Sequence, residues 1–209
     1  QSCARQNSRV TRIRMTAQQR REQLLSVGKE LFASRGYEAV TVEEIAGAAE
    51  VSKPVVYEHF GGKEGLYAVI VDREMQALLK LITDSLTGDH PRLLLEQAAT
   101  ALFDYIEGDT DGFAILVRDS PVPTGNFASL IVDIAGHVEH LLAKQFKSRG
   151  YNTKLAPMYS QMLVGMVAVT GQWWLDVRKP EKDEVVAHLV NLTYNGFAHL
   201  EHKPRLGGG

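Results

Sequence analysis

The chain has 209 residues, 44% of them hydrophobic, and a formal net charge of −2. This length and composition fit one or two globular domains with a substantial core. The longest apolar stretch, near residues 162–169, is too short to span a bilayer, and the single cysteine, Cys3, excludes an intramolecular disulfide. The arginine-rich start has no apolar core typical of a signal peptide, so we expect a cytoplasmic protein without a membrane partner.

Charge is distributed unevenly along the chain. Residues 1–66 contain ten Lys and Arg against eight Asp and Glu, a charge of +2, whereas the remainder contains 13 against 17, a charge of −4. The first 21 residues include six arginines and no acid. We therefore predict that residues 1–16 form a disordered basic arm, in which Arg12 and Arg14 are suited to a DNA minor groove. The alternative is a solvated tail without a partner.

Three helices are predicted in residues 17–62. The first runs from about Ala17 to Arg35 and is ended by Gly36. Thr41 and Glu44 have the spacing of a capping box, which predicts a second helix over residues 42–49. Ser52 is expected to cap a third helix that ends before Gly61, with Pro54 in its first turn, where a missing N–H is tolerated. The last two form a helix-turn-helix.

A helix-turn-helix places the start of its second helix against base edges in the major groove. Lys53 can donate to guanine, and Pro54 and Val55 can contact thymine methyl groups. Hydroxyl, imidazole and ammonium groups nearby can bind phosphates. The predicted DNA-contacting residues are Thr41, Ser52, Lys53, Pro54, Val55, Tyr57, His59 and Lys63, with Arg12 and Arg14 of the arm. The alternative is an ordinary helical hairpin with a solvated face, because such hairpins are common.

A resemblance favours the DNA-binding interpretation. The segment VSKPVVYEHFGGKEGLY resembles the recognition helix and following segment of the TetR family of transcriptional repressors. The preceding LFASRGYEAVTVEEIAGAAE is similar to that family's first two helices, and the match covers about residues 20–70. Glu50 departs from the glycine that many relatives have in the turn. The resemblance implies a DNA-binding head followed by a helical ligand-binding and dimerisation domain.

The rest of the chain reads as helices separated by glycine and proline. We predict helices near residues 63–86, 91–107, 113–118, 127–149, 157–177 and 181–199, with no strand. The fold class is therefore all-α with about nine helices. The expected domains are a helix-turn-helix domain at 17–62, a ligand-binding and dimerisation domain at 63–202 and a flexible tail at 203–209.

The segment 157–177 is apolar on nearly all sides, which requires burial all round. A dimer through the last two helices would provide this burial, with Gly165, Ala168 and Gly171 permitting close approach. The family resemblance implies the same interface. A dimer also suits a palindromic operator, because its two heads can enter successive major grooves.

Large aromatic and methionine side chains in the C-terminal half are candidates for an apolar ligand pocket. The family resemblance implies such a cavity and a small apolar effector that releases DNA. The alternative for each residue is plain core packing. The candidates are Phe103, Tyr105, Phe113, Phe127, Met162, Met166, Trp173 and Trp174.

Other functions lack support in the sequence. Gly61 and Gly62 precede Lys63, but the spacing of a phosphate-binding loop is missing, and no catalytic motif is present. His137 and His140 are three residues apart on one helix without an obvious third ligand, so we predict no metal and no cofactor. The remaining alternatives are a transcriptional activator, or a ligand-binding or scaffold protein without specific DNA recognition.

Overall fold

The computed structural model describes residues 15–117 and 127–205, and within these ranges the chain is all-helical, as predicted. A short 3₁₀ turn, η1 (Thr153–Leu155), precedes α8. The nine α-helices of the described ranges are α1 (Ala17–Arg35), α2 (Val42–Ala48), α3 (Lys53–Phe60), α4 (Lys63–Ser85), α5 (Pro91–Gly108), α6 (Thr110–Val117), α7 (Phe127–Ser148), α8 (Ala156–Val177) and α9 (Lys182–Ala198).

Local signals fix most helix ends. The predicted capping box of α2 is present, with Thr41 accepting from the Glu44 amide and the Glu44 carboxylate accepting from the Thr41 amide. The hydroxyl of Ser52, in contrast, makes no capping hydrogen bond to α3, so this part of the prediction was wrong. Gly61 ends α3 with a φ of 73°, a left-handed conformation that glycine adopts without strain.

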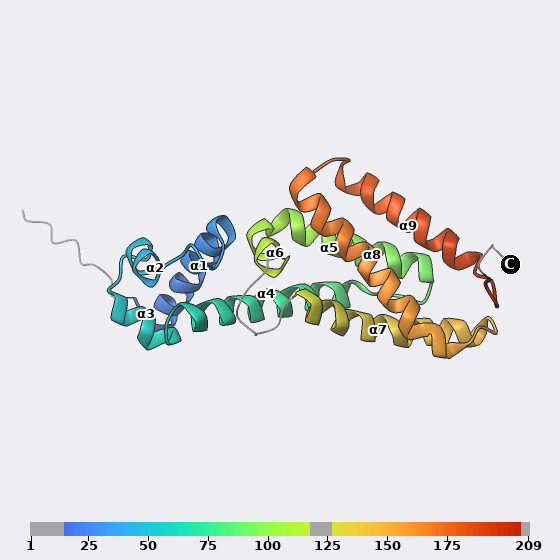
Figure 1. The fold of residues 1–209 in the computed structure, drawn as a ribbon, viewed down its shortest axis with the longest axis horizontal. Helices are drawn as coiled ribbons and strands as arrows, with labels where there is room; N and C mark the ends of the chain where they lie inside the picture. Colours follow the sequence, from blue (N-terminus) through green and yellow to red (C-terminus); the bar gives the residue numbers. More distant parts are fainter. Residues whose placement is uncertain (1–14, 118–126, 206–209) are drawn as a thin grey trace, which may run out of the picture.

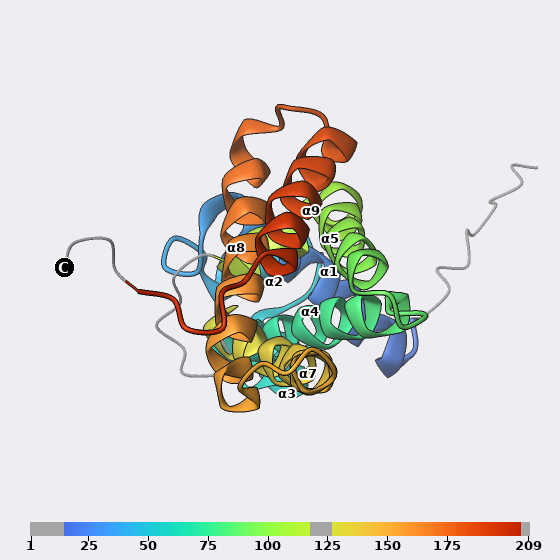
Figure 2. The same cartoon turned by 90° about the vertical axis from the view of Figure 1, so that its right-hand side faces the viewer.

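The molecule is elongated, with α1, α2 and α3 at one end (Figure 1). Helix α4 starts beside this helical head and runs along the molecule to the other end, where α5, α7, α8 and α9 gather. Seen end-on, α8 and α9 lie side by side above α4 and α7 (Figure 2). Within this body, α7 packs along α8, and α5 packs against both α4 and α9.

One continuous hydrophobic core joins the head to the body. In the head, Ile45 and Val56 are fully buried between the helices of the helix-turn-helix. The rings of Phe32 and Tyr37 both meet the ring of Tyr67, at centroid distances of 5.1 and 4.9 Å. Because Tyr67 belongs to α4, this aromatic cluster fixes the head to the helix that continues into the body.

Polar contacts join the two parts as well. The ammonium of Lys29 in α1 lies 2.7 Å from a carboxylate oxygen of Glu74 in α4 and 2.5 Å from one of Asp109 at the end of α5. The hydroxyl of Tyr105 donates to the other oxygen of Glu74 at 2.6 Å. We call these four residues the Lys29 network. It connects the head to two helices of the body.

Candidate nucleic-acid interface and cavity

The start of α3 is an open surface. Ser52, Lys53 and Pro54 are exposed, and Tyr57 is 48% exposed one turn further along. Val55 and His59 are half-buried, and Val55 also packs against the core. Since Val56 holds the opposite side of α3 in the core, the N-terminal turn projects away from the body. This is the geometry that a helix needs to enter a major groove.

Lys53 has a partner within the head. Its ammonium donates to the carboxylate of Glu43 in α2 and lies 6.0 Å from the ring centroid of Tyr57. The hydrogen bond to Glu43 raises the pKa of Lys53, and the same bond lowers the pKa of Glu43. Both side chains are exposed, so the pair is weak and Lys53 can exchange Glu43 for a base or phosphate.

Two predicted phosphate contacts are engaged in intramolecular hydrogen bonds. The Thr41 hydroxyl donates to Glu44 at 2.9 Å and also accepts from its amide. The ammonium of Lys63 donates to the carbonyl of Tyr37 at 3.0 Å and lies 4.1 Å from its ring centroid. Lys63 therefore ties the start of α4 to the loop before α2, a structural role that the sequence did not reveal.

Arg21 also has a role that the sequence did not reveal. Its guanidinium donates to the carbonyl of His59 at 2.8 Å and lies 4.4 Å from the ring centroid of Phe60. Arg21 thus holds the end of α3 against α1 and helps to fix the direction of the candidate recognition helix. Its sequence signal was hidden among the neighbouring arginines of the basic arm. The predicted contacts Arg12 and Arg14 lie outside the described residues.

The body contains an apolar cavity of about 340 Å³ between α4, α5, α7 and α8. This size falls within the range of small-molecule sites. Aliphatic side chains make most of its wall, including Leu78, Ile82, Leu102, Leu130, Ile134 and Val167.

The residues that line the cavity differ from those predicted from the sequence. Of the eight predicted pocket residues, the seven whose side chains are described do not line this cavity; the side chain of Phe127 lies outside the description. The buried ones, Phe103, Tyr105, Phe113 and Trp174, fill the core instead. The exposed ones, Met162, Met166 and Trp173, lie on the surface of α8. Large side chains occupy space, whereas the cavity is bounded by branched aliphatic residues.

An exposed apolar stripe runs along α8. Its members recur at intervals of three or four residues and so lie on one helix face. They are Met158, Met162, Met166, Val169, Trp173 and Val177, and Leu192 on neighbouring α9 is 64% exposed. We call these seven residues the α8 stripe. A large exposed apolar surface of this kind is typical of a protein interface.

The small residues of α8 do not all face this surface. Ala168 is buried, and a Cβ added to Gly171 would lie 3.0 Å from Ile106 and 3.1 Å from Leu102 of α5. The expectation that Ala168 and Gly171 permit close approach of a partner was therefore wrong. Gly171 permits close packing of α8 on α5 within one chain, and Ala168 lines the cavity. Gly165 and, on α9, Gly196 have open space around their Cβ positions.

Two other features are absent from the described residues. No group of three His, Cys, Asp or Glu side chains in this part of the chain is placed to hold a metal ion. His137 is exposed, and its Nδ1 lies 2.9 Å from the carbonyl oxygen of Asp133. None of the described helices combines the length and apolar composition needed to cross a membrane.

Comparisons with known proteins agree with the helix-turn-helix head and helical body. Residues 24–70 match the profile of bacterial regulatory proteins of the tetR family, and residues 91–196 match the tetracyclin repressor-like C-terminal domain. The HTH-type transcriptional activator FasR of Mycolicibacterium smegmatis is 30% identical over 190 residues, covering 90% of this chain and 87% of that protein.

Two further proteins are similar to this chain, one in sequence and one in structure. The HTH-type transcriptional repressor KstR2 of Rhodococcus jostii is 32% identical over 97 residues, or 46% of this chain and 48% of that protein. The crystal structure of a TetR-like transcriptional regulator from Rhodococcus sp. RHA1 superposes with a TM-score of 0.74 at 22% identity, covering 88% of this chain and 99% of that one. The chain belongs to the TetR family: it is a DNA-binding transcriptional regulator and not an enzyme.

Proposed function

We propose that the protein is a homodimer that binds a palindromic DNA operator through the N-terminal turn of α3. In this proposal residues 17–62 recognise DNA, and residues 63–202 dimerise and bind a small apolar effector. The exposed surface of Ser52, Lys53 and Pro54, projecting away from the body, carries the proposal. The alternative is a ligand-binding or scaffold helical dimer without specific DNA recognition. This alternative assigns no function to the exposed start of α3.

The proposed contacts have distinct roles. Lys53, Pro54 and Val55 read base edges, and Ser52, Thr41, Tyr57, His59 and Lys63 bind phosphates. Arg12 and Arg14 reach into the minor groove. Thr41 and Lys63 would contribute only by exchanging or sharing their present hydrogen-bond partners, since both are engaged within the head.

Effector binding would change the spacing of the two heads. Helix α4 lines the cavity with Leu78 and Ile82 and also contacts the head through Tyr67 and Glu74. An effector that prefers one position of α4 therefore favours one spacing of the heads over another. We propose that the bound effector releases the operator, so that the protein acts as a cytoplasmic repressor.

Activation of transcription is the second candidate. It is favoured by the resemblance to FasR of M. smegmatis, which is named an activator and aligns with 90% of this chain. The two modes differ in where the operator lies relative to the promoter. A reporter gene can be placed behind a promoter region that contains the operator. Comparing its transcription with and without the regulator distinguishes the two modes, because a repressor lowers transcription and an activator raises it.

Selection of bound sequences from random DNA duplexes, at near-physiological salt, tests the proposal. We expect enrichment of an inverted repeat whose half-sites lie about 34–36 Å apart, or a multiple of that distance, as a two-fold symmetric dimer requires. Weak, salt-sensitive binding without an enriched sequence would contradict the proposal and support the scaffold interpretation.

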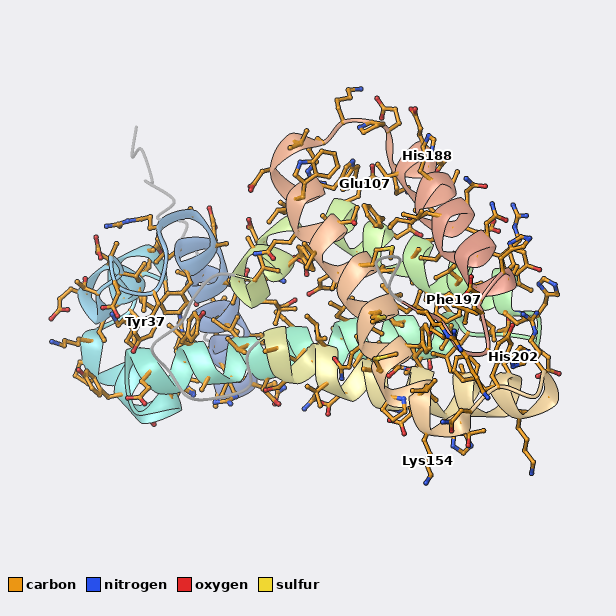
Figure 3. The ribbon with its side chains drawn as sticks, turned by 45° about the vertical axis from the view of Figure 1, so that its right-hand side comes forward. Tyr37, Glu107, Lys154, His188, Phe197 and His202 are labelled. Atoms are coloured by element: carbon orange, nitrogen blue, oxygen red, sulfur yellow. The ribbon has the colours of Figure 1, made fainter. Side chains whose placement is uncertain are left out.

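The selected duplex then tests the role of Lys53. Lys53→Ala should weaken binding by about tenfold and relax the preference at one base pair of each half-site, because a lysine donor to guanine would be lost. Lys154→Ala, at the opposite end of the molecule (Figure 3), is the matched control and should change neither property. An unchanged sequence profile for Lys53→Ala would refute its assignment as a base contact.

A further inference from the structure

A second, smaller cavity adjoins the first one. It encloses about 90 Å³ between α5, α7, α8 and α9, and its wall also includes Tyr151 of the loop after α7. The two cavities share five wall residues: Pro91, Leu95, Leu142, Gln145 and Leu163. The two cavities therefore adjoin, with these common side chains at the boundary between them.

The combined space extends along α7. Helix α7 lines the larger cavity from Leu130 to Gln145, a separation of about 22 Å at 1.5 Å per residue. The smaller cavity continues beyond this point to Arg149 and Phe197. In Figure 3, Phe197 lies at the end of the molecule opposite Tyr37 of the head. A space of this shape suits an extended chain better than a compact ring system.

Two basic side chains line this space near the end of α7. Lys144 lines the larger cavity and Arg149 the smaller one, and both are exposed. No carboxylate of the described residues forms an ion pair with either side chain. The one acidic residue in the two walls is Asp89, which is also exposed. His137 of α7 also lines the larger cavity. Two exposed cations without an ion-pair partner among the described residues, and one carboxylate, thus lie in the wall of a mostly apolar space.

We propose that the effector is an amphiphile with one long apolar chain and an anionic head group, a carboxylate or a phosphate ester. The chain lies along α7 in the larger cavity, and the head group is held by Lys144 and Arg149 at the outer end. Burial of the chain supplies most of the affinity, and the charge-assisted hydrogen bonds orient the ligand. This inference rests on the proposed effector function of the cavity and names the chemistry of its ligand.

Titration calorimetry with the full chain, in the absence of DNA, tests the inference. The probes are dodecanoate, dodecyl phosphate, dodecanol and dodecyltrimethylammonium, each below its micelle concentration, and dodecanoyl-coenzyme A. We expect at least one anionic probe to bind about tenfold more tightly than the alcohol, and the cation to bind most weakly. Equal affinities, a preference for the cation or no binding of any probe would overturn the inference.

The anionic probes also distinguish the source of the charge. Tight binding of dodecanoate indicates a free acid, and tight binding of only the phosphate or coenzyme A compound indicates a phosphorylated head group. Extending the favoured probe by one methylene should tighten binding by about threefold to fourfold until the cavity is full. Affinity that does not depend on chain length would contradict burial of the chain.

Variants at the rim test the location of the head group. Arg149→Gln and Lys144→Gln should each weaken the favoured anionic probe by about fivefold to tenfold and leave dodecanol unchanged. Lys147→Gln is the matched control, because Lys147 is exposed on the same helix but lines neither cavity. An equal effect of Lys147→Gln would show that only the general positive charge matters, which contradicts a head-group site.

DNA binding separates this inference from the proposed function. If the selected operator is bound and no probe binds, the inference fails while the regulator stands. If an anionic probe binds and no operator is found, the inference stands and the scaffold interpretation replaces the regulator.

Discussion

At the scale of single residues, the Lys29 network is a partly buried polar link between head and body. Burial lowers the pKa of Lys29, but hydrogen bonds to Asp109 and Glu74 outweigh burial and raise it. Burial likewise opposes the charge of Asp109, and the hydrogen bond from Lys29 brings its pKa below the ordinary value. The charges of Lys29 and Asp109 are therefore maintained by their partners and would be costly alone.

We expect Lys29→Met to lower the free energy of unfolding by about 2–3 kcal/mol, because it leaves two carboxylates close together in a partly buried site. Chemical denaturation at pH 7 measures this loss. Lys80→Met is the control, because Lys80 pairs with Asp84 on the surface, where its side chain is 75% exposed, and no measurable loss is expected. A loss in Lys29→Met no larger than in the control would mean that water satisfies the network.

At the scale of elements, the capping box of α2 links pH to the stability of the helix-turn-helix. Hydrogen bonds from Arg35 and from the amide and hydroxyl of Thr41 lower the pKa of Glu44 from 4.5 to about 2. A carboxylate whose pKa is lower in the folded protein stabilises the fold at pH values above its pKa in the unfolded chain. That contribution is lost as the pH falls from about 4.5 toward 2.

Glu44→Gln should therefore have a flatter dependence of melting temperature on pH between 4.5 and 2, because glutamine can cap without titrating. Melting curves followed by circular dichroism across this range provide the measurement. Glu96→Gln, on the exposed side of α5, should keep the dependence of the natural protein. If Glu44→Gln also keeps it, other carboxylates determine the acid response.

Close packing of α3 on α4 depends on Gly65. A Cβ at this position would lie 1.9 Å from the carbonyl oxygen of Phe60, which is backbone and cannot move independently. Gly65→Ala should therefore force the candidate recognition helix away from α4, with a loss of about 2–3 kcal/mol of unfolding free energy and weaker operator binding.

The control for this prediction is another helical glycine of the head. Gly47 in α2 has no atom within 4 Å of its Cβ position, so Gly47→Ala should raise the free energy of unfolding by about 0.5–1 kcal/mol. Denaturation curves of the two alanine variants measure both effects. A stabilising effect of Gly65→Ala would show that α3 and α4 separate without cost.

The helices could be predicted from the sequence because their ends are determined locally. The Thr41–Glu44 box and the glycines at 36 and 61 ended or started helices close to the predicted residues. The start of α6 was placed too late, because the segment from Gly108 to Gly112 indicates a break, whereas Gly112 lies inside α6 and its amide donates to the carboxylate of Asp109. The cavity wall was missed for a different reason. A void depends on how α4, α5, α7 and α8 meet, and residue type alone does not reveal that geometry.

At the scale of the whole molecule, α4 connects three features that lie far apart. Its start contacts the loop of the head through Lys63, its middle carries Glu74 of the Lys29 network, and its last turns line the cavity with Leu78 and Ile82. Any movement of α4 caused by a ligand therefore acts on both attachments of the head. This continuity is the physical reason to expect coupling between the cavity and DNA.

Dimerisation completes the proposed regulator, and we expect it to depend on the α8 stripe. Val169 lies in the middle of the stripe and is 61% exposed. We expect Val169→Glu to produce a folded monomer, because a charge at the centre of an apolar interface cannot be solvated or paired. Operator affinity should then fall at least a hundredfold, since a single head contacts only one half-site.

Sedimentation velocity at micromolar protein, together with binding to the selected duplex, measures both effects. Leu93→Glu is the matched control, because Leu93 is an exposed aliphatic residue of α5 outside the stripe, 44% accessible, and should leave dimer and affinity intact. A Val169→Glu protein that still sediments as a dimer would move the interface elsewhere. A monomer that binds the duplex with undiminished affinity would instead separate operator recognition from two-fold symmetry, and the palindromic operator would lose its structural basis.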